Sequence, residues 1–195
     1  MTGSMSKNKF AILGIILGVV FIGTASAYYL LSSTAEEPID WDVTLIGSNG
    51  EQKVLTYQDI RNLPSHEARG GYLTTAGIVY GPYEVKGVLL QDICDLVGGI
   101  PADGFVSVNA PDGYSMAIDY DQIYNGGFLM WEPETLHEVT SDNQIVLLTY
   151  EWDGGPISHN DGAPLRLAVV SDEAFLTEGH NWVKWVDEIE VRIGK

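Results

Sequence analysis

The chain has 195 residues, 45% of them hydrophobic, which is enough for one ordinary domain with a continuous core. Its 27 acidic and 10 basic residues give a formal charge of −17 at pH 7. This charge excludes nucleic acid as a partner, because the phosphates would be repelled rather than neutralised.

An apolar segment is the first predicted element. Residues 10–31 carry no charge over 22 positions, about 33 Å as a helix, and the hydrocarbon layer of a bilayer is about 30 Å thick. Lys7 and Lys9 precede it, which predicts a cytoplasmic N-terminus at residues 1–9 and a domain on the extracytoplasmic side of the membrane. The same letters also fit a signal peptide that is cleaved after Ala27. Both interpretations export the domain, and we expect a retained single-pass anchor.

A short polar tether follows at residues 32–40, and residues 41–195 form the predicted domain. The part of the chain after residue 31 keeps 8 basic and all 27 acidic residues, a formal charge of −19. Such acidity favours solubility more than it favours an acid-seeking ligand.

Two hairpins and two short helices are predicted in the first two thirds of the domain. Residues 42–57 alternate apolar and polar side chains around an Asn-Gly turn, and residues 104–120 do so around Pro-Asp-Gly. Thr56 and Asp59 resemble a capping box at the start of one helix. The other helix contains Cys94, the single cysteine, which lies next to an apolar stripe and is expected to be a small core residue.

Strands are predicted late in the chain at residues 143–154, 164–170 and 181–191. Several short strands with two or three brief helices and no βαβ rhythm indicate an α+β domain built on antiparallel or mixed sheets.

Common catalytic signatures are absent from the sequence, including the nucleophile elbow, the P-loop, the dinucleotide fingerprint and C-x-x-C. His159, Asp161, Glu178 and His180 lie near the ends of strands that could be neighbours, and a metal site with nitrogen and oxygen ligands is conceivable there. Ordinary loop polarity is the simpler explanation of these residues, and we expect it over a metal site.

Two cations interrupt apolar stretches. Arg166 follows Leu165 in "APLRLAVV", and Lys184 lies between Val183 and Trp185 in "NWVKWVDEIEV". A charge at such a position must be paired or must face a ligand. One interpretation is an anion site, with phosphate as the ligand. The other is a pair of buried salt bridges to nearby acids, for which the candidates are Asp161, Glu151 and Asp187.

These motifs carry a resemblance to a known family. The stretch "LLTYEWDGGPISHNDGAPLRLAVV", followed by "NWVKWVDEIEV", resembles the sulfite oxidase-like molybdopterin-binding domain, and "GVLLQDICDLVG" and "NAPDGYSMAIDYDQI" resemble its middle section. The resemblance covers residues 41–193 and implies an α+β, mixed-sheet fold that holds a pyranopterin in a cleft. It also implies molybdopterin as the cofactor.

The resemblance implies roles for particular residues. Arg166 and Lys184 match the family's contacts to the phosphate and pterin of the cofactor. Trp182 and Val183 match positions whose backbone meets the pterin, and Asp161 stands where relatives usually carry histidine or asparagine.

The sequence departs from the family at the metal. Enzymes of the family bind molybdenum through one cysteine, and an ungapped count places Thr75 at that position. A hydroxyl is a much weaker ligand than a soft thiolate, so no metal ligand is assigned. Cys94 falls about 19 residues too late to substitute. The family's short Pro-Gly link is also replaced by the acidic residues 171–180.

Two functions remain in competition. The first is an exported, membrane-anchored molybdopterin-binding oxidoreductase with a membrane-bound redox partner, and the missing cysteine argues against its turnover. The second is a non-catalytic module that kept the fold and binds another ligand or a partner protein. In the second case the cleft would be lined by some of Tyr72, Tyr80, Tyr83, Tyr114 and Trp182.

Overall fold

The computed structural model describes residues 39–141 and 143–194. Within this part of the chain, no helix is long and apolar enough to cross a membrane. The predicted anchor at residues 10–31 and most of the tether lie outside the described residues.

A five-stranded sheet holds the two ends of the described chain together, in the order β2-β1-β13-β5-β6. Its strands are β1 (Asp42–Ile46), β2 (Gln52–Thr56), β5 (Gly104–Asn109), β6 (Ser115–Asp119) and β13 (Glu188–Ile193). β1 and β13 are parallel and pair Leu45 with Ile189, whereas β13 and β5 are antiparallel. The predicted mixed sheet is therefore confirmed here.

An eight-stranded sheet forms the rest of the strand structure, in the order β10-β9-β4-β3-β12-β7-β8, with β11 also paired to β9. Its longer strands are β3 (His66–Leu73), β4 (Val79–Leu89), β9 (Ile145–Trp152) and β11 (Arg166–Val170). Its short strands are β7 (Met130–Trp131), β8 (Glu138–Val139), β10 (Gly155–Pro156) and β12 (Leu176–Glu178). β12 runs parallel to β3, and the other pairs are antiparallel.

Three short α-helices are described: α2 (Tyr57–Arg61), α3 (Leu90–Asp95) and α4 (Tyr120–Asn125). The 3-10 turns η1 (His159–Asp161) and η2 (Gly179–Asn181) follow later in the chain. Thr56 and Asp59 form the predicted capping box at the start of α2, and Asp119 with Gln122 forms another at α4.

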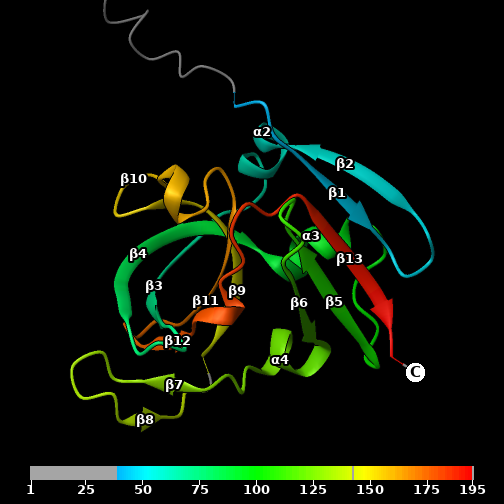
Figure 1. Cartoon of the computed structure of the whole chain (residues 1–195). Coiled ribbons are helices and arrows are strands. Elements are labelled where there is room, and N and C mark those ends of the chain that lie inside the picture. Colours follow the sequence, from blue (N-terminus) through cyan, green and yellow to red (C-terminus); the bar gives the residue numbers. More distant parts are fainter. Residues whose placement is uncertain (1–38, 142, 195) are drawn as a thin grey trace, which may run out of the picture. The chain divides into compact units, whose positions relative to one another are not determined.

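The main core lies between the two sheets (Figure 1). It joins Leu45 and Ile189 of the five-stranded sheet to Leu148 and Leu167 of the eight-stranded sheet, all of them fully buried. Cys94 of α3 belongs to this core, as expected from its apolar stripe. A smaller apolar cluster, which includes Trp152 and Trp182, lies on the eight-stranded sheet.

Both predicted hairpins are present, as β1-β2 and β5-β6. The strand predicted for residues 181–191 begins only at Glu188, so the prediction was wrong for the segment with Lys184. That segment runs as a loop, and Trp185 within it has φ +54°, a conformation that a regular strand does not contain. The acidic segment 171–180, expected as a loop, contains β12.

Candidate functional site

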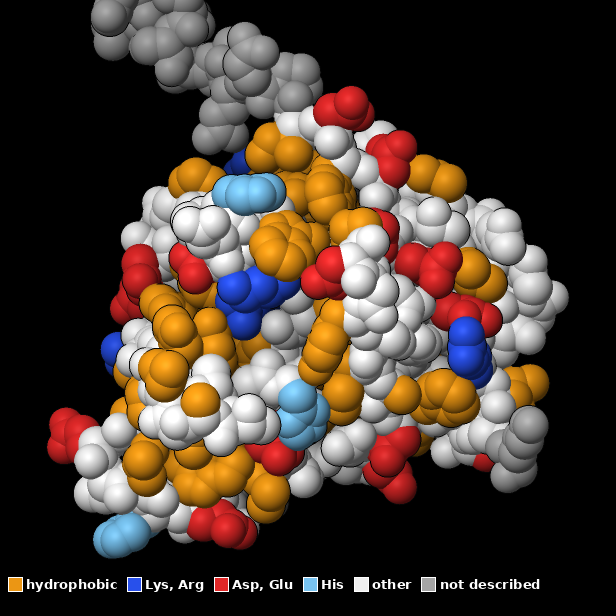
Figure 2. Space-filling view, in the orientation of Figure 1, with side chains coloured by type: hydrophobic (Ala, Val, Ile, Leu, Met, Phe, Trp, Pro, Cys, Tyr) orange, Lys and Arg blue, Asp and Glu red, His pale blue; other side chains and the backbone are white. Residues whose placement is uncertain are grey.

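A cavity of about 530 Å³, here named the aromatic cavity, lies at one end of the eight-stranded sheet. Its walls are Tyr72, Thr74, Tyr80, Asp112, Tyr114, Asn160, Asp161, Arg166, Gly179, Trp182, Lys184 and Trp185. The β5-β6 turn of the other sheet contributes Asp112 and Tyr114, so both sheets build it. Figure 2 shows basic side chains gathered near the middle of one face, bordered by hydrophobic ones.

Arg166 forms the floor of the aromatic cavity. It is the first residue of β11 and only 2% of it is exposed. Its guanidinium carbon lies 4.6 Å from the ring centre of Tyr72, 5.2 Å from that of Trp152 and 5.6 Å from that of Trp182, which are cation–π distances. The charge is therefore held by aromatic faces.

The hydrogen bonds of Arg166 leave a buried donor without a partner in the described part of the chain. Nη1 donates to the backbone oxygen of Asp161 at 2.8 Å and, at the long distance of 3.5 Å, to the hydroxyl of Tyr72. Nε is buried and has no acceptor among the described residues. A buried donor without a partner costs about 1–3 kcal/mol, so this guanidinium has capacity for an acceptor that the protein does not supply.

The rings around Arg166 are themselves fixed by hydrogen bonds. Trp182 Nε1 donates to Thr177 Oγ1 at 2.8 Å, and Thr177 Oγ1 donates to the backbone oxygen of Val169 at 3.0 Å. Trp152 Nε1 donates to Thr149 Oγ1 at 3.2 Å. The indoles are thus oriented by the strands, and the site is preorganised.

Lys184 lies on the wall of the aromatic cavity in the loop before β13. Its ammonium donates to the backbone oxygen of Asn160 and lies 5.6 Å from the ring centre of Trp185. Trp185 Nε1 donates to the backbone oxygen of His159 at 3.1 Å, which ties this loop to η1. Gly162 lets the two segments approach, since a Cβ there would lie 2.9 Å from Lys184 Cβ.

The two cations are not in salt bridges. Among the described residues, neither Arg166 nor Lys184 has a carboxylate oxygen within 4.0 Å. The interpretation as salt bridges to Asp161, Glu151 or Asp187 is therefore wrong for this structure. Burial lowers the pKa of Arg166, and burial together with the charge of Arg166 lowers the pKa of Lys184.

Four of the predicted site residues meet at the aromatic cavity: Asp161, Arg166, Trp182 and Lys184. Val183 is fully buried in the main core, and its backbone oxygen accepts from Leu167 N at 2.9 Å instead.

The position expected for the cysteine ligand lies near the aromatic cavity but does not line it. Thr75 is exposed in the β3-β4 turn, and the neighbouring Thr74 lines the wall. β3 has a register shift between Gly70 and Tyr72. A count along the sequence does not include such an irregularity, which changes the face a side chain takes.

Sequence reasoning missed Asp112, Asn160 and Trp185 as wall residues. Four of the five aromatic residues expected in the cleft line the aromatic cavity. The fifth, Tyr83, stacks on Trp152 with the ring centres 4.5 Å apart. Trp185 adjoins Lys184 in the sequence, and that adjacency was the available signal.

Residues of the described part do not gather into a metal site. No group of three or more His, Cys, Asp or Glu side chains could hold an ion there. Glu178 and His180 approach each other at 3.8 Å, while His159 stacks near Trp185. Burial raises the pKa of Cys94 to about 12, and its side chain lies in the main core and does not line the aromatic cavity.

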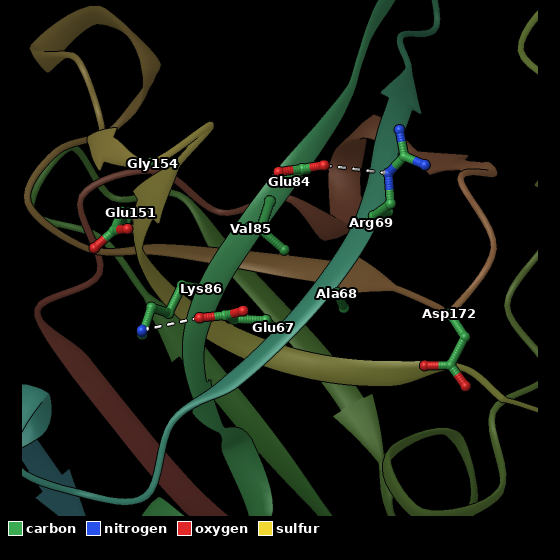
Figure 3. A pocket seen from close by; sticks show the side chains of 9 residues that line it. All are labelled: Glu67, Ala68, Arg69, Glu84, Val85, Lys86, Glu151, Gly154 and Asp172. Carbon is green, nitrogen blue, oxygen red and sulfur yellow. Dashed lines mark hydrogen bonds and ion pairs between the residues drawn. The ribbon is translucent and has the colours of Figure 1, made fainter.

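A second hollow of about 410 Å³, here named the acidic groove, lies on the outer side of the eight-stranded sheet (Figure 3). It is lined by Glu67, Ala68, Arg69, Glu84, Val85, Lys86, Glu151, Gly154 and Asp172. Its two cations are paired: Lys86 with Glu67 at 2.9 Å and Arg69 with Glu84 at 4.0 Å.

Fold and site together define a class: a mixed-sheet α+β domain with a cationic, aromatic cavity. The family model of the oxidoreductase molybdopterin binding domain matches residues 31–194, and the chain belongs to this family. Molybdopterin is the cofactor that this membership implies.

Individual relatives agree with this assignment. Sulfite oxidase of Arabidopsis thaliana is 27% identical over an alignment of 169 residues, and the match covers 77% of this chain and 42% of the relative. The crystal structure of the sulfane dehydrogenase SoxCD from Paracoccus pantotrophus matches with a TM-score of 0.58 at 16% identity, over 81% of this chain and 39% of that one. The chain thus spans about two fifths of each, and the second likeness concerns the fold alone.

The residues of the aromatic cavity fit part of the cofactor. The unpartnered Nε of Arg166 and the ammonium of Lys184 suit an anionic phosphate, and the rings of Trp182 and Tyr72 suit a flat heterocycle. The described residues offer no thiolate for a metal beside them.

Proposed function

We propose that this chain is an exported, membrane-anchored domain that binds molybdopterin in the aromatic cavity and performs no efficient turnover at a metal. The observation that carries the proposal is a pair of cations at a cavity, without carboxylate partners among the described residues, in a chain of a molybdopterin-binding family.

Arg166 and Lys184 would hold the phosphate end of the cofactor. Arg166 lies on the floor, with its position fixed by the aromatic rings, and Lys184 lies on the wall. A phosphate that accepts from both would satisfy Nε and replace the missing carboxylates. Hydrogen bonds to charged groups contribute about 1.5–3 kcal/mol each, which is enough for selective retention.

Trp182 and Tyr72 would line the pterin, with their ring centres 5.0 Å apart. A bound molybdopterin supplies two thiolates of its own for a metal and redox activity. The chain itself lacks the protein thiolate of its family, because Cys94 is buried in the core and Thr75 is an exposed hydroxyl. Loss of that ligand supports the absence of efficient turnover.

The proposal is tested on protein purified from its native host. We expect pterin at about one per chain, measured by fluorescence after oxidative release, with molybdenum or tungsten well below that amount by elemental analysis. Metal at one per chain would support an active oxidoreductase. Folded protein with neither pterin nor metal would contradict molybdopterin binding.

A second candidate is a non-catalytic module for a different aromatic or anionic ligand. It is favoured by Asp112 and Asp161, which line the same cavity as the two cations. Their carboxylates lower the affinity of the cavity for a dianion such as phosphate. Native mass spectrometry separates the two functions, because the mass of the retained ligand identifies it.

Export and anchoring rest on the apolar residues 10–31 and the lysines before them. We expect the full chain in the membrane fraction, with the domain cut by protease added from the extracytoplasmic side. Release of the domain by salt alone, or protection from the protease, would contradict the single-pass anchor.

A further inference from the structure

The aromatic cavity changes character between its floor and its rim. Arg166, Trp182 and Tyr72 form the floor and are only 2%, 3% and 5% exposed. Tyr80 and Tyr114 form the rim and are 38% and 43% exposed. A ligand held on the floor alone would therefore leave the rim rings accessible to a second molecule.

The rim is fixed in place. Tyr114 donates its hydroxyl to the backbone oxygen of His180 at 2.8 Å, which joins the β5-β6 turn to η2. Tyr80 stacks on Tyr72 with the ring centres 4.9 Å apart and an interplanar angle of 13°. Both aromatic rings are thus oriented before a ligand arrives.

A bound phosphate would neutralise the cations of the aromatic cavity and leave its carboxylates without a counter-charge. Among the described residues, Arg166 and Lys184 are the cationic residues of the wall, and the proposed function assigns both to the cofactor. Asp112 and Asp161 then remain as the charged groups of the wall. Each carboxylate uses one oxygen locally, Asp112 Oδ1 for Tyr114 N and Asp161 Oδ2 for Ser158 Oγ.

Once the cofactor occupies both cations, an approaching oxyanion is repelled by the net charge of the domain and by the carboxylates of the cavity wall. The chain beyond residue 31 carries a formal charge of −19, and Asp112 lies exposed at the rim. A cation is attracted by the same carboxylate and by the faces of the rim tyrosines, and an uncharged organic group gains apolar contact with them.

We infer that the substrate or co-ligand which enters beside the bound cofactor is a cationic or uncharged organic molecule and not an oxyanion, with Asp112 as a specificity-determining residue. This inference rests on the proposed function, since it requires both cations to be occupied. It contrasts with the sulfite in the name of the plant relative.

The test compares three probes by calorimetry on cofactor-loaded protein: choline, its uncharged isostere 3,3-dimethyl-1-butanol, and sulfate. We expect choline to bind most tightly and sulfate not to compete with it. Asp112→Asn should weaken choline about twofold to fivefold, the range for one partly exposed charge pair, and leave the isostere unchanged.

Asp172→Asn is the matched control, because it removes one carboxylate from the acidic groove and alters the net charge equally. Equal weakening by both variants, or sulfate that binds and displaces choline, would overturn the inference while the proposed function stands. Pterin content is measured on the same samples, and wild-type protein without pterin overturns the proposed function and this inference together.

Discussion

The acidic groove and the aromatic cavity each contain two cationic side chains, which differ in their burial and in their carboxylate partners. In the groove, Arg69 and Lys86 lie opposite Glu84 and Glu67 across neighbouring strands and are partly or largely exposed. In the cavity, Arg166 is buried without a carboxylate within 4.0 Å among the described residues. The paired, exposed cations contribute little beyond solubility, whereas a buried cation without a carboxylate partner carries a desolvation cost that, under the proposed function, ligand binding would offset.

Replacing the buried arginine should have the largest effect on this contrast. Arg166→Met keeps much of the side-chain volume and removes the charge, and we expect the affinity for molybdopterin to fall about tenfold to a hundredfold. Pterin content and its dissociation rate measure this. Arg69→Met in the acidic groove is the control and should retain full content; equal losses in both variants would remove the distinction between the two hollows.

Two glycines, one at each hollow, allow the packing of the backbone to be compared. Gly162 (φ +108°) lies against Lys184, while Gly154 (φ +77°) in the groove has open space where a Cβ would be. Both alanine variants meet backbone strain, but Gly162→Ala also overpacks, so its free energy of unfolding should fall by about 1–3 kcal/mol more. Urea denaturation measures the difference, and equal losses would contradict the close approach.

The pH dependence of cofactor affinity should follow the protonation of Lys184. Burial and the charge of Arg166 lower its pKa from the ordinary value, so in the free protein its positive charge is lost at a lower pH than that of an exposed lysine. Phosphate needs the charged form, so affinity should decline as pH rises through this lowered pKa, at a lower pH than an exposed lysine would give. We expect Lys184→Met to remove the decline in a titration of binding against pH, and Lys86→Met in the groove to preserve it.

Cys94 should show the smallest effect on the site. It lies in the main core with its pKa raised to about 12, so Cys94→Ala should leave pterin and metal content unchanged. Elemental analysis and released-pterin fluorescence check this. A loss of bound metal in the variant would show that the thiol reaches the cofactor after all.

Local signals in the sequence were reliable. The Asn-Gly and Pro-Asp-Gly turns set the registers of β1-β2 and β5-β6, and the capping box of Thr56 placed α2. Arg166 was found because a charge between leucines demands a partner or a ligand. Such arguments depend on neighbours in the chain and not on the fold.

Features that depend on contacts between distant segments could not be predicted from the sequence. The alternation around Lys184 imitates a strand, but Trp185 at φ +54° and its contact with η1 turn the segment into a loop. Asp112 reaches the cavity only because the two sheets meet there. β3 also has a register shift between Gly70 and Tyr72, which a count along the sequence does not contain, since register is decided by pairing across strands. The placement of Thr75 at the position of the cysteine ligand stays a prediction.

The position of β13 has a consequence for how the domain is made. This strand is the last one in the described chain, yet it lies between β1 and β5 in the middle of its sheet. During synthesis, β1 and β5 cannot pair with β13 until residues 188–193 have been made. A premature stop before Glu188 would therefore split the sheet into two separate hairpins, and we expect such a fragment to be degraded or to aggregate through its unpaired edges.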